Sequence, residues 1–130
     1  MSETAALQIL VVDDDPRSRE LMTLILTHAG FAVVAAEHPQ AAIALLAAIR
    51  PALALVDFMM PGMDGLEFCR WVRLQPEHAT MRFVLLTGTD SAETRKDAAA
   101  AGVDAVVTKP FDRPQLLSTL NSLLGLPTAR

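Results

Sequence analysis

Side chains that could hold a cation or an anion stand directly after four short apolar segments of this sequence. They are Asp13 to Asp15, Asp57, Thr87, and Thr108 with Lys109. Converging carboxylates repel one another unless a cation lies between them, and oxygen ligands without a thiolate suit Mg²⁺. A lysine ammonium can pair with a carboxylate or a phosphate, and a threonine hydroxyl can donate a hydrogen bond. Together these side chains could hold an anionic group beside a divalent cation, which is the arrangement that phosphoryl transfer requires.

Five apolar segments rich in β-branched residues must position these groups. The predicted strands span residues 7–12, 31–36, 53–56, 83–86 and 105–108. Their apolar residues run continuously instead of alternating with polar ones, which indicates strands buried on both faces, as in a parallel sheet. Only the second strand ends without a distinctive chemical group, so we expect it at the sheet edge away from the site.

Helix signals fill the intervals between the strands. The expected starts are at Asp15 with Pro16, Pro39, Asp64, Ser91 and Asp112, and the expected stops at Gly30, Pro51, Pro76, Gly102 and Gly125. In the first helix, Leu21, Leu24 and Ile25 mark the expected apolar stripe. The fourth helix offers the core mostly alanines, so we expect it to be the least firmly anchored; they are Ala92, Ala98, Ala99 and Ala101.

Alternating strands and helices with short connections predict an α/β fold. The chain forms five βα units, and the right-handed crossover rule makes a doubly wound, five-stranded parallel sheet, (βα)5, the natural arrangement. Ligands of such sheets bind outside the carboxyl ends of the strands. The polar groups at four strand ends are therefore expected to meet at one site.

Composition narrows the class of protein. With 130 residues, 52% of them hydrophobic and 20% charged, the chain has the size and composition of one globular domain. The single Cys69 excludes an internal disulfide and a cysteine-based zinc site, and favours a reducing cytoplasm. No apolar run approaches the ~20 residues of a membrane span. A net charge of -4 without a Lys/Arg cluster argues against direct nucleic-acid binding by this domain.

Four segments resemble the receiver domain of bacterial two-component response regulators. They span residues 11–15, 56–65, 86–88 and 108–111, in the family's order and at its spacing. The resemblance covers about residues 7–125 and makes residues 1–130 a single receiver domain. It implies a flavodoxin-like sheet with the strand order 2-1-3-4-5.

The resemblance implies a role for each acidic group. Asp57 accepts a phosphoryl group from a phosphohistidine of a sensor histidine kinase or a phosphotransfer protein, in a reaction that depends on Mg²⁺. Asp13 and Asp14 hold the ion together with Asp57 and the backbone carbonyl of Met59. The domain is then a phosphorylation-activated switch and not an enzyme, since it catalyses only its own phosphoryl uptake and autodephosphorylation. Asp15 is expected to cap a helix rather than to bind the ion.

The remaining strand-end residues take the family's switching roles. Thr87 hydrogen-bonds the acyl phosphate, Lys109 pairs with it, and the Lys109–Pro110 peptide is expected to be cis. The chain departs from the family at Val106, where many members have a tyrosine or phenylalanine. The aromatic rotamer change that accompanies the movement of the threonine in those members is therefore not expected here.

Two other functions fit parts of the pattern. A hydrolase of the haloacid-dehalogenase type also uses an Asp nucleophile, Mg²⁺, a Thr or Ser and a Lys, and Asp13 with Asp15 forms an Asp-x-Asp pair. Pro16 interrupts that motif, the chain has no room for a cap domain, and Asp57 would have no role. The third function is a docking domain that has lost phosphorylation, which the intact Asp57, Lys109 and acidic pair disfavour.

The expected partners are proteins. A kinase or phosphotransfer protein supplies the phosphoryl group, and a downstream protein or a fused output domain receives the signal. The chain is expected to be either a stand-alone receiver or the first domain of a longer regulator. A second copy of the chain, forming a homodimer, is a further candidate partner. Trp71 is expected to pack on its own helix rather than to anchor a partner, and Cys69 to lie in the core. The histidines are expected on the surface or at helix ends.

Overall fold

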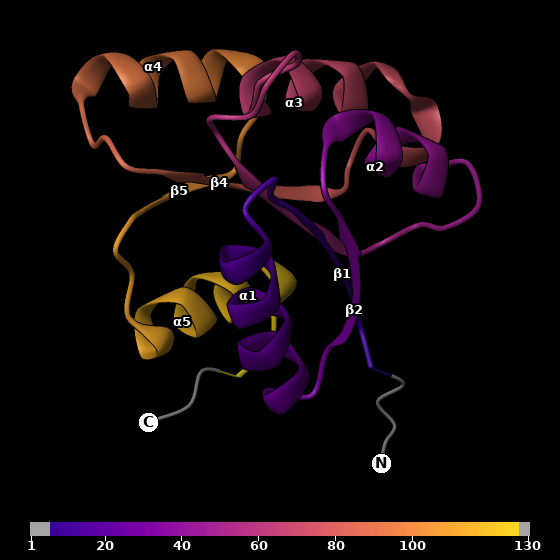
Figure 1. Ribbon diagram of the computed structural model, residues 1–130, viewed down its shortest axis with the longest axis vertical. Coiled ribbons are helices and arrows are strands. Elements are labelled where there is room, and N and C mark those ends of the chain that lie inside the picture. Colours follow the sequence, from indigo (N-terminus) through magenta and orange to yellow (C-terminus); the bar gives the residue numbers. More distant parts are fainter. Residues whose placement is uncertain (1–5, 128–130) are drawn as a thin grey trace.

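Within residues 6–127, which the computed structural model describes, five strands alternate with five α-helices (Figure 1). The strands are β1 (Gln8–Val12), β2 (Ala32–Ala36), β3 (Leu53–Asp57), β4 (Arg82–Thr87) and β5 (Ala105–Thr108). The helices are α1 (Pro16–His28), α2 (Pro39–Leu46), α3 (Gly65–Leu74), α4 (Ala92–Ala101) and α5 (Arg113–Leu124), and a 3-10 helix, η1 (Pro76–His78), follows α3. The predicted (βα)5 order is confirmed; residues 1–5 and 128–130 of the predicted domain lie outside the described residues.

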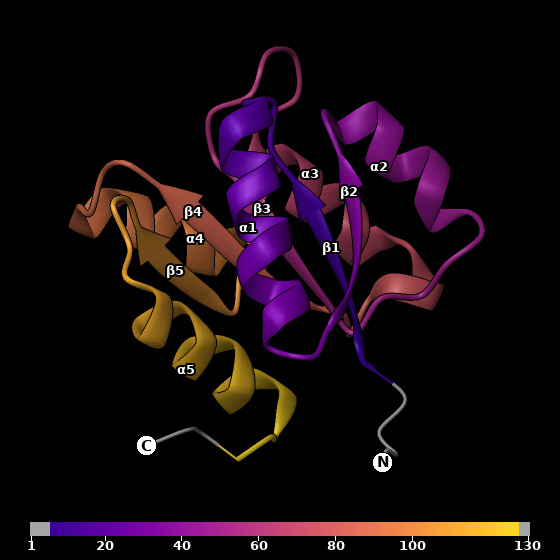
Figure 2. The same cartoon turned by 60° about the horizontal axis from the view of Figure 1, so that its bottom comes forward.

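The strands form one parallel sheet in the order β2-β1-β3-β4-β5, so the predicted flavodoxin-like topology is confirmed. Val12 at the end of β1 pairs with Val56, and Thr87 at the end of β4 pairs with Thr108. The strand arrows accordingly point to one edge of the sheet (Figure 2). Residues that follow β1, β3, β4 and β5 are thereby brought to the same edge.

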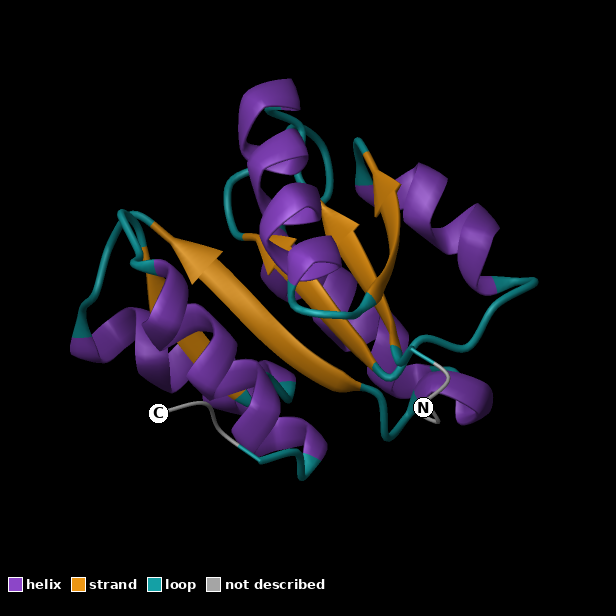
Figure 3. Ribbon diagram, turned by 90° about the horizontal axis from the view of Figure 1, so that it is seen from below, coloured by secondary structure: helices purple, strands orange, loops and turns teal. Residues whose placement is uncertain are grey.

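Two layers of helices cover the sheet, with α2, α3 and α4 on one face and α1 and α5 on the other (Figure 1, Figure 3). Successive side chains of a strand point to opposite faces. Leu10 and Val12 therefore pack in the core beneath α2, α3 and α4, whereas Ile9 and Val11 pack in the core beneath α1 and α5. This double burial explains why the strand sequences are continuously apolar. In the described part of the chain, no helix is long and apolar enough to cross a membrane.

Side chains cap the helices at the predicted positions. Each predicted N-cap aspartate or serine accepts a backbone hydrogen bond from the first turn of its helix; these residues are Asp15, Asp64, Ser91 and Asp112. Gly102, with a φ of 97°, adopts the left-handed conformation that ends α4. His38 caps α2 and His28 ends α1, as expected for helix-end residues. His78 ends η1 but is buried, with Nε2 2.8 Å from the Leu46 carbonyl oxygen.

Two expected helix faces are wrong in detail. Leu21 and Leu24 are 53% and 55% exposed, and α1 instead buries Met22 and Leu26. Both pairs have helical spacing, so the periodicity predicts a stripe without deciding which of two adjacent apolar stripes faces the sheet. In α4 the expected inward residues Ala92 and Ala99 are exposed, and only Ala98 and Ala101 are buried among its residues. That α4 is weakly anchored stays a prediction.

The expectations for α3 are confirmed. Cys69 is buried, its Sγ lies 3.4 Å from the Ala101 carbonyl oxygen, and burial raises the pKa of its thiol to about 11. Such a thiol stays protonated and packs as a small apolar side chain. Trp71 stacks on Phe68 with a centroid distance of 6.3 Å and an interplanar angle of 8°. Trp71 therefore packs against its own helix.

Candidate functional site

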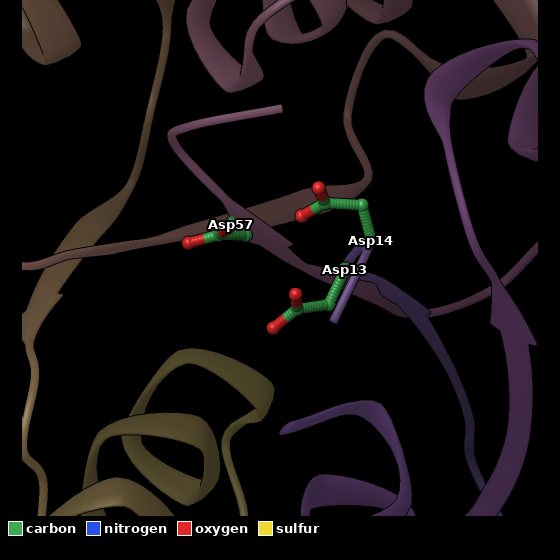
Figure 4. A group of neighbouring side chains, drawn as sticks. All are labelled: Asp13, Asp14 and Asp57. Carbon is green, nitrogen blue, oxygen red and sulfur yellow. The ribbon is translucent and has the colours of Figure 1, made fainter. Parts of the chain in front are cut away.

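Three carboxylates gather at the carboxyl ends of β1 and β3 (Figure 4). Asp13 and Asp14 follow β1 directly, and Asp57 is the last residue of β3. Each offers one oxygen, and these oxygens lie within 4.8 Å of one another. Asp13 and Asp57 are buried, whereas Asp14 is exposed. The sheet thus brings the three predicted residues together; their action as metal ligands stays a prediction.

Asp13 carries a buried carboxylate oxygen that has no hydrogen-bond partner among the described residues. That oxygen is Oδ2, whereas Oδ1 accepts the Asp15 N–H at 2.9 Å. Burial is the main cause that raises the pKa of Asp13. The Asp15 amide and the Lys109 ammonium oppose the shift, and the negative charges of Asp57 and Asp14 add to it. A buried oxygen without a hydrogen bond, whose nearest positive charge is the Lys109 ammonium at 3.9 Å, fits a hard divalent cation such as Mg²⁺ when two further carboxylates lie beside it.

Lys109 places a positive charge against this cluster. It follows β5 directly, and its Nζ lies 2.9 Å from Oδ1 of Asp57 and 3.9 Å from Oδ2 of Asp13. The Lys109 backbone N–H donates to the Thr87 carbonyl at 2.8 Å, which extends the pairing of β4 with β5. The Lys109–Pro110 peptide is cis, as predicted. One cation therefore contacts two of the three carboxylates.

Thr87 ends the strand next to β3, and Met59 follows β3. Among residues 6–127, neither side chain forms a hydrogen bond to the three carboxylates. Thr87 is buried at the end of β4, and its Oγ1 accepts the Thr89 N–H at 3.1 Å. Within the described residues, no hydrogen bond joins Thr87 to Asp57. Met59 lies two residues beyond Asp57 with an exposed side chain. The roles of the Thr87 hydroxyl and the Met59 carbonyl stay predictions.

Asp15 belongs to α1, as expected. Its carboxylate accepts the Arg17 N–H at 3.2 Å and the Ser18 hydroxyl at 3.1 Å. The Ser18 hydroxyl and then the Arg17 amide hold the pKa of Asp15 below its usual value. Asp15 therefore caps the helix that begins at Pro16.

Two features of the site were not predicted from the sequence. Arg19 donates from Nη1 to the backbone carbonyl oxygen of Asp13 at 2.8 Å. A cleft also lies beside Asp13 and Lys109, and its walls include Leu21, Pro110 and Phe111. A basic residue one turn beyond an N-cap aspartate is the only sequence signal for the first feature. No local pattern signals the cleft, because it forms where α1 approaches residues 109–111.

Comparisons with known proteins agree with this geometry. The family model of the response regulator receiver domain matches residues 9–121. Response regulator MprA of Mycolicibacterium vanbaalenii is 37% identical over 121 residues, which cover 93% of this chain and 52% of that protein. Transcriptional regulatory protein ResD of Bacillus subtilis is 35% identical over 124 residues, covering 95% of this chain and 50% of that protein. The chain thus spans about half the length of these curated relatives.

Solved structures give the same answer for the fold. The chemotaxis protein CheY4 of Vibrio cholerae has a TM-score of 0.89 and 32% sequence identity, over 92% of this chain and 100% of that chain. A receiver domain of a signal transduction histidine kinase from Syntrophus aciditrophicus has a TM-score of 0.85 and 32% identity, over 96% of each chain. The strand order, the acidic strand ends and the matched residues 9–121 lead to one conclusion: this chain belongs to the response regulator receiver domain family, the phosphorylation-activated switches of two-component signalling.

Proposed function

We propose that Asp57 is the phosphoryl acceptor of this receiver domain, and that its donor is a phosphohistidine of a sensor histidine kinase or a phosphotransfer protein. The strongest support is the position of its carboxylate, which is buried, 2.9 Å from the Lys109 ammonium and beside Asp13 and Asp14. An ammonium in contact with the acceptor offsets the negative charge that accumulates when a phosphoryl group arrives. The same contact also orients the carboxylate.

The proposed step is a direct transfer between two side chains. A carboxylate oxygen of Asp57 attacks the phosphorus of the phosphohistidine, an oxygen–phosphorus bond forms, and the nitrogen–phosphorus bond breaks. The electron pair of that bond leaves with the imidazole. Lys109 then pairs with the acyl phosphate, and the Thr87 hydroxyl donates a hydrogen bond to it. Support for the second role is that Thr87 Oγ1 accepts the Thr89 N–H, which leaves the hydroxyl hydrogen available.

We further propose that the acidic cluster holds Mg²⁺ during this transfer. The ligands would be the carboxylates of Asp13, Asp14 and Asp57 and the backbone carbonyl of Met59. A bound Mg²⁺ supplies positive charge that stabilises the phosphoryl oxygens in the transition state. Oδ2 of Asp13 supports the assignment, since this buried charged oxygen accepts no hydrogen bond from the described residues and the Lys109 ammonium stays 3.9 Å away from it.

The acyl phosphate is also proposed to hydrolyse at this site. The positive charge of Lys109 that assists formation of the acyl phosphate equally stabilises attack by water on its phosphorus. The domain would then limit the lifetime of its own signal.

We propose that residues 1–130 form a single receiver domain in the cytoplasm. The signal would pass to a downstream protein or a fused output domain, without direct nucleic-acid binding by this domain.

Intact-mass spectrometry tests the acceptor. Acetyl phosphate with Mg²⁺ is expected to add one phosphoryl group to the wild type, and chelation of the metal to prevent this. Asp57→Asn should remove the addition, while Asp97→Asn, at an exposed position of α4, should retain it. Incorporation into Asp57→Asn at the wild-type level would contradict the assignment. Hydrolysis of a phosphate ester that survives Asp57→Asn would instead favour the hydrolase alternative.

A further inference from the structure

The side chain of Arg19 contacts the backbone that follows β1, and not the carboxylates of the cluster. It is the fourth residue of α1, and helical side chains lean toward the N-terminus of their helix. This direction carries its guanidinium back past the N-cap, where Nη1 donates to the Asp13 carbonyl oxygen at 2.8 Å. That oxygen belongs to the peptide group that joins Asp13 to Asp14. Arg19 therefore holds the link between two carboxylates of the cluster.

Stabilisation of α1 does not explain this arrangement. A cation near the N-terminus of a helix opposes the helix dipole. Asp15 already caps the helix through the Arg17 N–H and the Ser18 hydroxyl. The half-buried guanidinium of Arg19 thus satisfies a carbonyl of the acidic loop rather than a group of its own helix.

The backbone around Asp13 is constrained on each side of this peptide. The Asp13 N–H donates to the Ala36 carbonyl at 3.2 Å, and its Oδ1 accepts the Asp15 N–H at 2.9 Å. Asp14 differs, because its side chain is exposed and no hydrogen bond from the described residues reaches its carboxylate. The direction in which the Asp14 side chain leaves the backbone consequently depends on the orientation of the peptide group that joins Asp13 to Asp14. The side chain of Arg19 donates a hydrogen bond to the carbonyl oxygen of this peptide group.

We propose that Arg19 is a positioning residue for the divalent-cation site, which keeps the carboxylates of Asp13 and Asp14 directed at a common point by holding the peptide between them. The inference rests on the proposed function, since it assumes that the acidic cluster binds a cation. Arg19 itself does not touch the cation. Its effect is on the affinity of the site and not on the acceptor Asp57.

The sign of the effect separates positioning from simple charge. A guanidinium near the cluster repels an approaching cation, so the loss of its charge alone would tighten cation binding. The loss of positioning has the opposite effect, because two ligands would then have to be ordered when the ion binds. Arg17 provides a matched control, since it lies in the same turn with an exposed side chain and carries the same charge.

Isothermal titration of Mg²⁺ into the unphosphorylated protein measures the difference. Arg19→Gln is expected to raise the Mg²⁺ dissociation constant about tenfold, as is typical when an outer partner of a metal site is removed. Arg17→Gln is expected to leave it within about twofold of the wild type, since exposed charges are screened by salt. Arg19→Lys retains the charge but loses the planar group with several donors, so an intermediate constant is expected.

A second readout locates the effect. At saturating Mg²⁺, Arg19→Gln should be phosphorylated by acetyl phosphate to the wild-type extent, because Asp57 and Lys109 are intact. A dissociation constant at or below the wild-type value, or a low extent that Mg²⁺ does not restore, would overturn the proposal. If thermal denaturation shows that Arg19→Gln does not fold, Arg19→Lys decides by the same criteria. Failure of the proposed function looks different, since Asp14→Asn would then bind Mg²⁺ as the wild type does.

Discussion

Nζ of Lys109 lies 2.9 Å from Oδ1 of Asp57, although 52 residues of sequence separate the two. The ion pair joins the ends of β5 and β3, which are not neighbours in the sheet because β4 lies between them. The long side chain of Lys109 therefore crosses the end of β4 to reach the acceptor carboxylate. Its ammonium therefore lies against the carboxylate that is proposed to receive the phosphoryl group.

Lys109→Met should affect metal binding and phosphorylation in opposite directions. It removes a positive charge that lies 2.9 Å from Asp57 and 3.9 Å from Asp13, so the affinity for Mg²⁺ is expected to rise. Phosphorylation by acetyl phosphate should fall at least about tenfold, because the developing negative charge loses its partner. Calorimetry and intact-mass kinetics measure the two effects. Lys96→Met, on the exposed face of α4, should change neither.

Asp13→Asn should stabilise the metal-free protein at neutral pH. The raised pKa of Asp13 means that its charged form is less stable in the folded protein than in the unfolded chain. Above the folded pKa the free energy of unfolding is therefore expected to increase by about 1–3 kcal/mol on substitution. The gain should shrink as the pH falls through the folded pKa, because the wild-type carboxyl is then protonated. Urea denaturation as a function of pH, without metal, measures this; a constant gain at all pH values would contradict it.

Gly65→Ala should destabilise the fold at the start of α3. A Cβ atom at Gly65 would lie 2.6 Å from the Asp57 carbonyl oxygen and 2.8 Å from Cδ1 of Leu85. The first neighbour is backbone and cannot turn away, so a loss of about 1–3 kcal/mol in the free energy of unfolding is expected. Gly88→Ala is the control, since nothing lies within 4 Å of its added Cβ. Equal denaturation midpoints for the two variants would show that α3 can shift without cost.

Met59→Asn should change the lifetime of the acyl phosphate without changing stability. Met59 lies two residues beyond Asp57 and is 71% exposed, so its truncation is expected to alter the free energy of unfolding by less than about 0.5 kcal/mol. A smaller polar side chain at this position is expected to give water easier access to the acyl phosphate. The decay rate after removal of acetyl phosphate is therefore expected to differ from that of the wild type. Thr89, two residues beyond Thr87, is the second position expected to flank the path by which water enters. Wild-type decay in both Met59→Asn and Thr89→Ala would contradict this prediction.

Phosphorylation should move the N-terminal end of α4 more than its C-terminal end. Arg73 donates to the Gly102 carbonyl at 2.7 and 3.0 Å and pairs with Asp104 at 3.0 Å, which ties the end of α4 to α3. At the other end, the Ser91 hydroxyl donates a hydrogen bond to the Thr94 hydroxyl, which belongs to α4 itself. Amide NMR shifts with a phosphoryl mimic are thus expected to be largest from Thr87 into the first turns of α4, and at Lys109.

Two further observations test how phosphorylation moves the start of α4. Thr87→Ala should reduce the shifts, since the threonine hydroxyl is proposed to follow the phosphoryl group. Val106 has no aromatic ring to rotate and is stiff about χ1, so the change is expected to proceed without a rotamer switch at that position. Perturbation centred on Trp71, with residues 87–102 unchanged, would place the output surface on α3 instead.

Local sequence was sufficient for the order of strands and helices and for the membership of the acidic cluster, whereas the strand order 2-1-3-4-5 was implied only by the family resemblance. Continuous apolar segments predict doubly buried strands, and residues such as Asp15 and Asp64 cap helices through contacts within three residues. A parallel sheet brings all its carboxyl ends to one edge. Asp13, Asp57 and Lys109 are therefore predictable members of one site, because each follows or ends a strand at that edge.

The tertiary structure decided which atoms of that site are satisfied and which helix faces are buried. Leu21 with Leu24 and Met22 with Leu26 have equivalent helical spacing, and only packing against the sheet selects the second pair. The unpartnered Oδ2 of Asp13 and the contact of Arg19 with the Asp13 carbonyl depend on how α1 is seated beside β1. Such contacts join groups through side-chain direction and burial, and neither quantity is encoded in the local spacing of residue types.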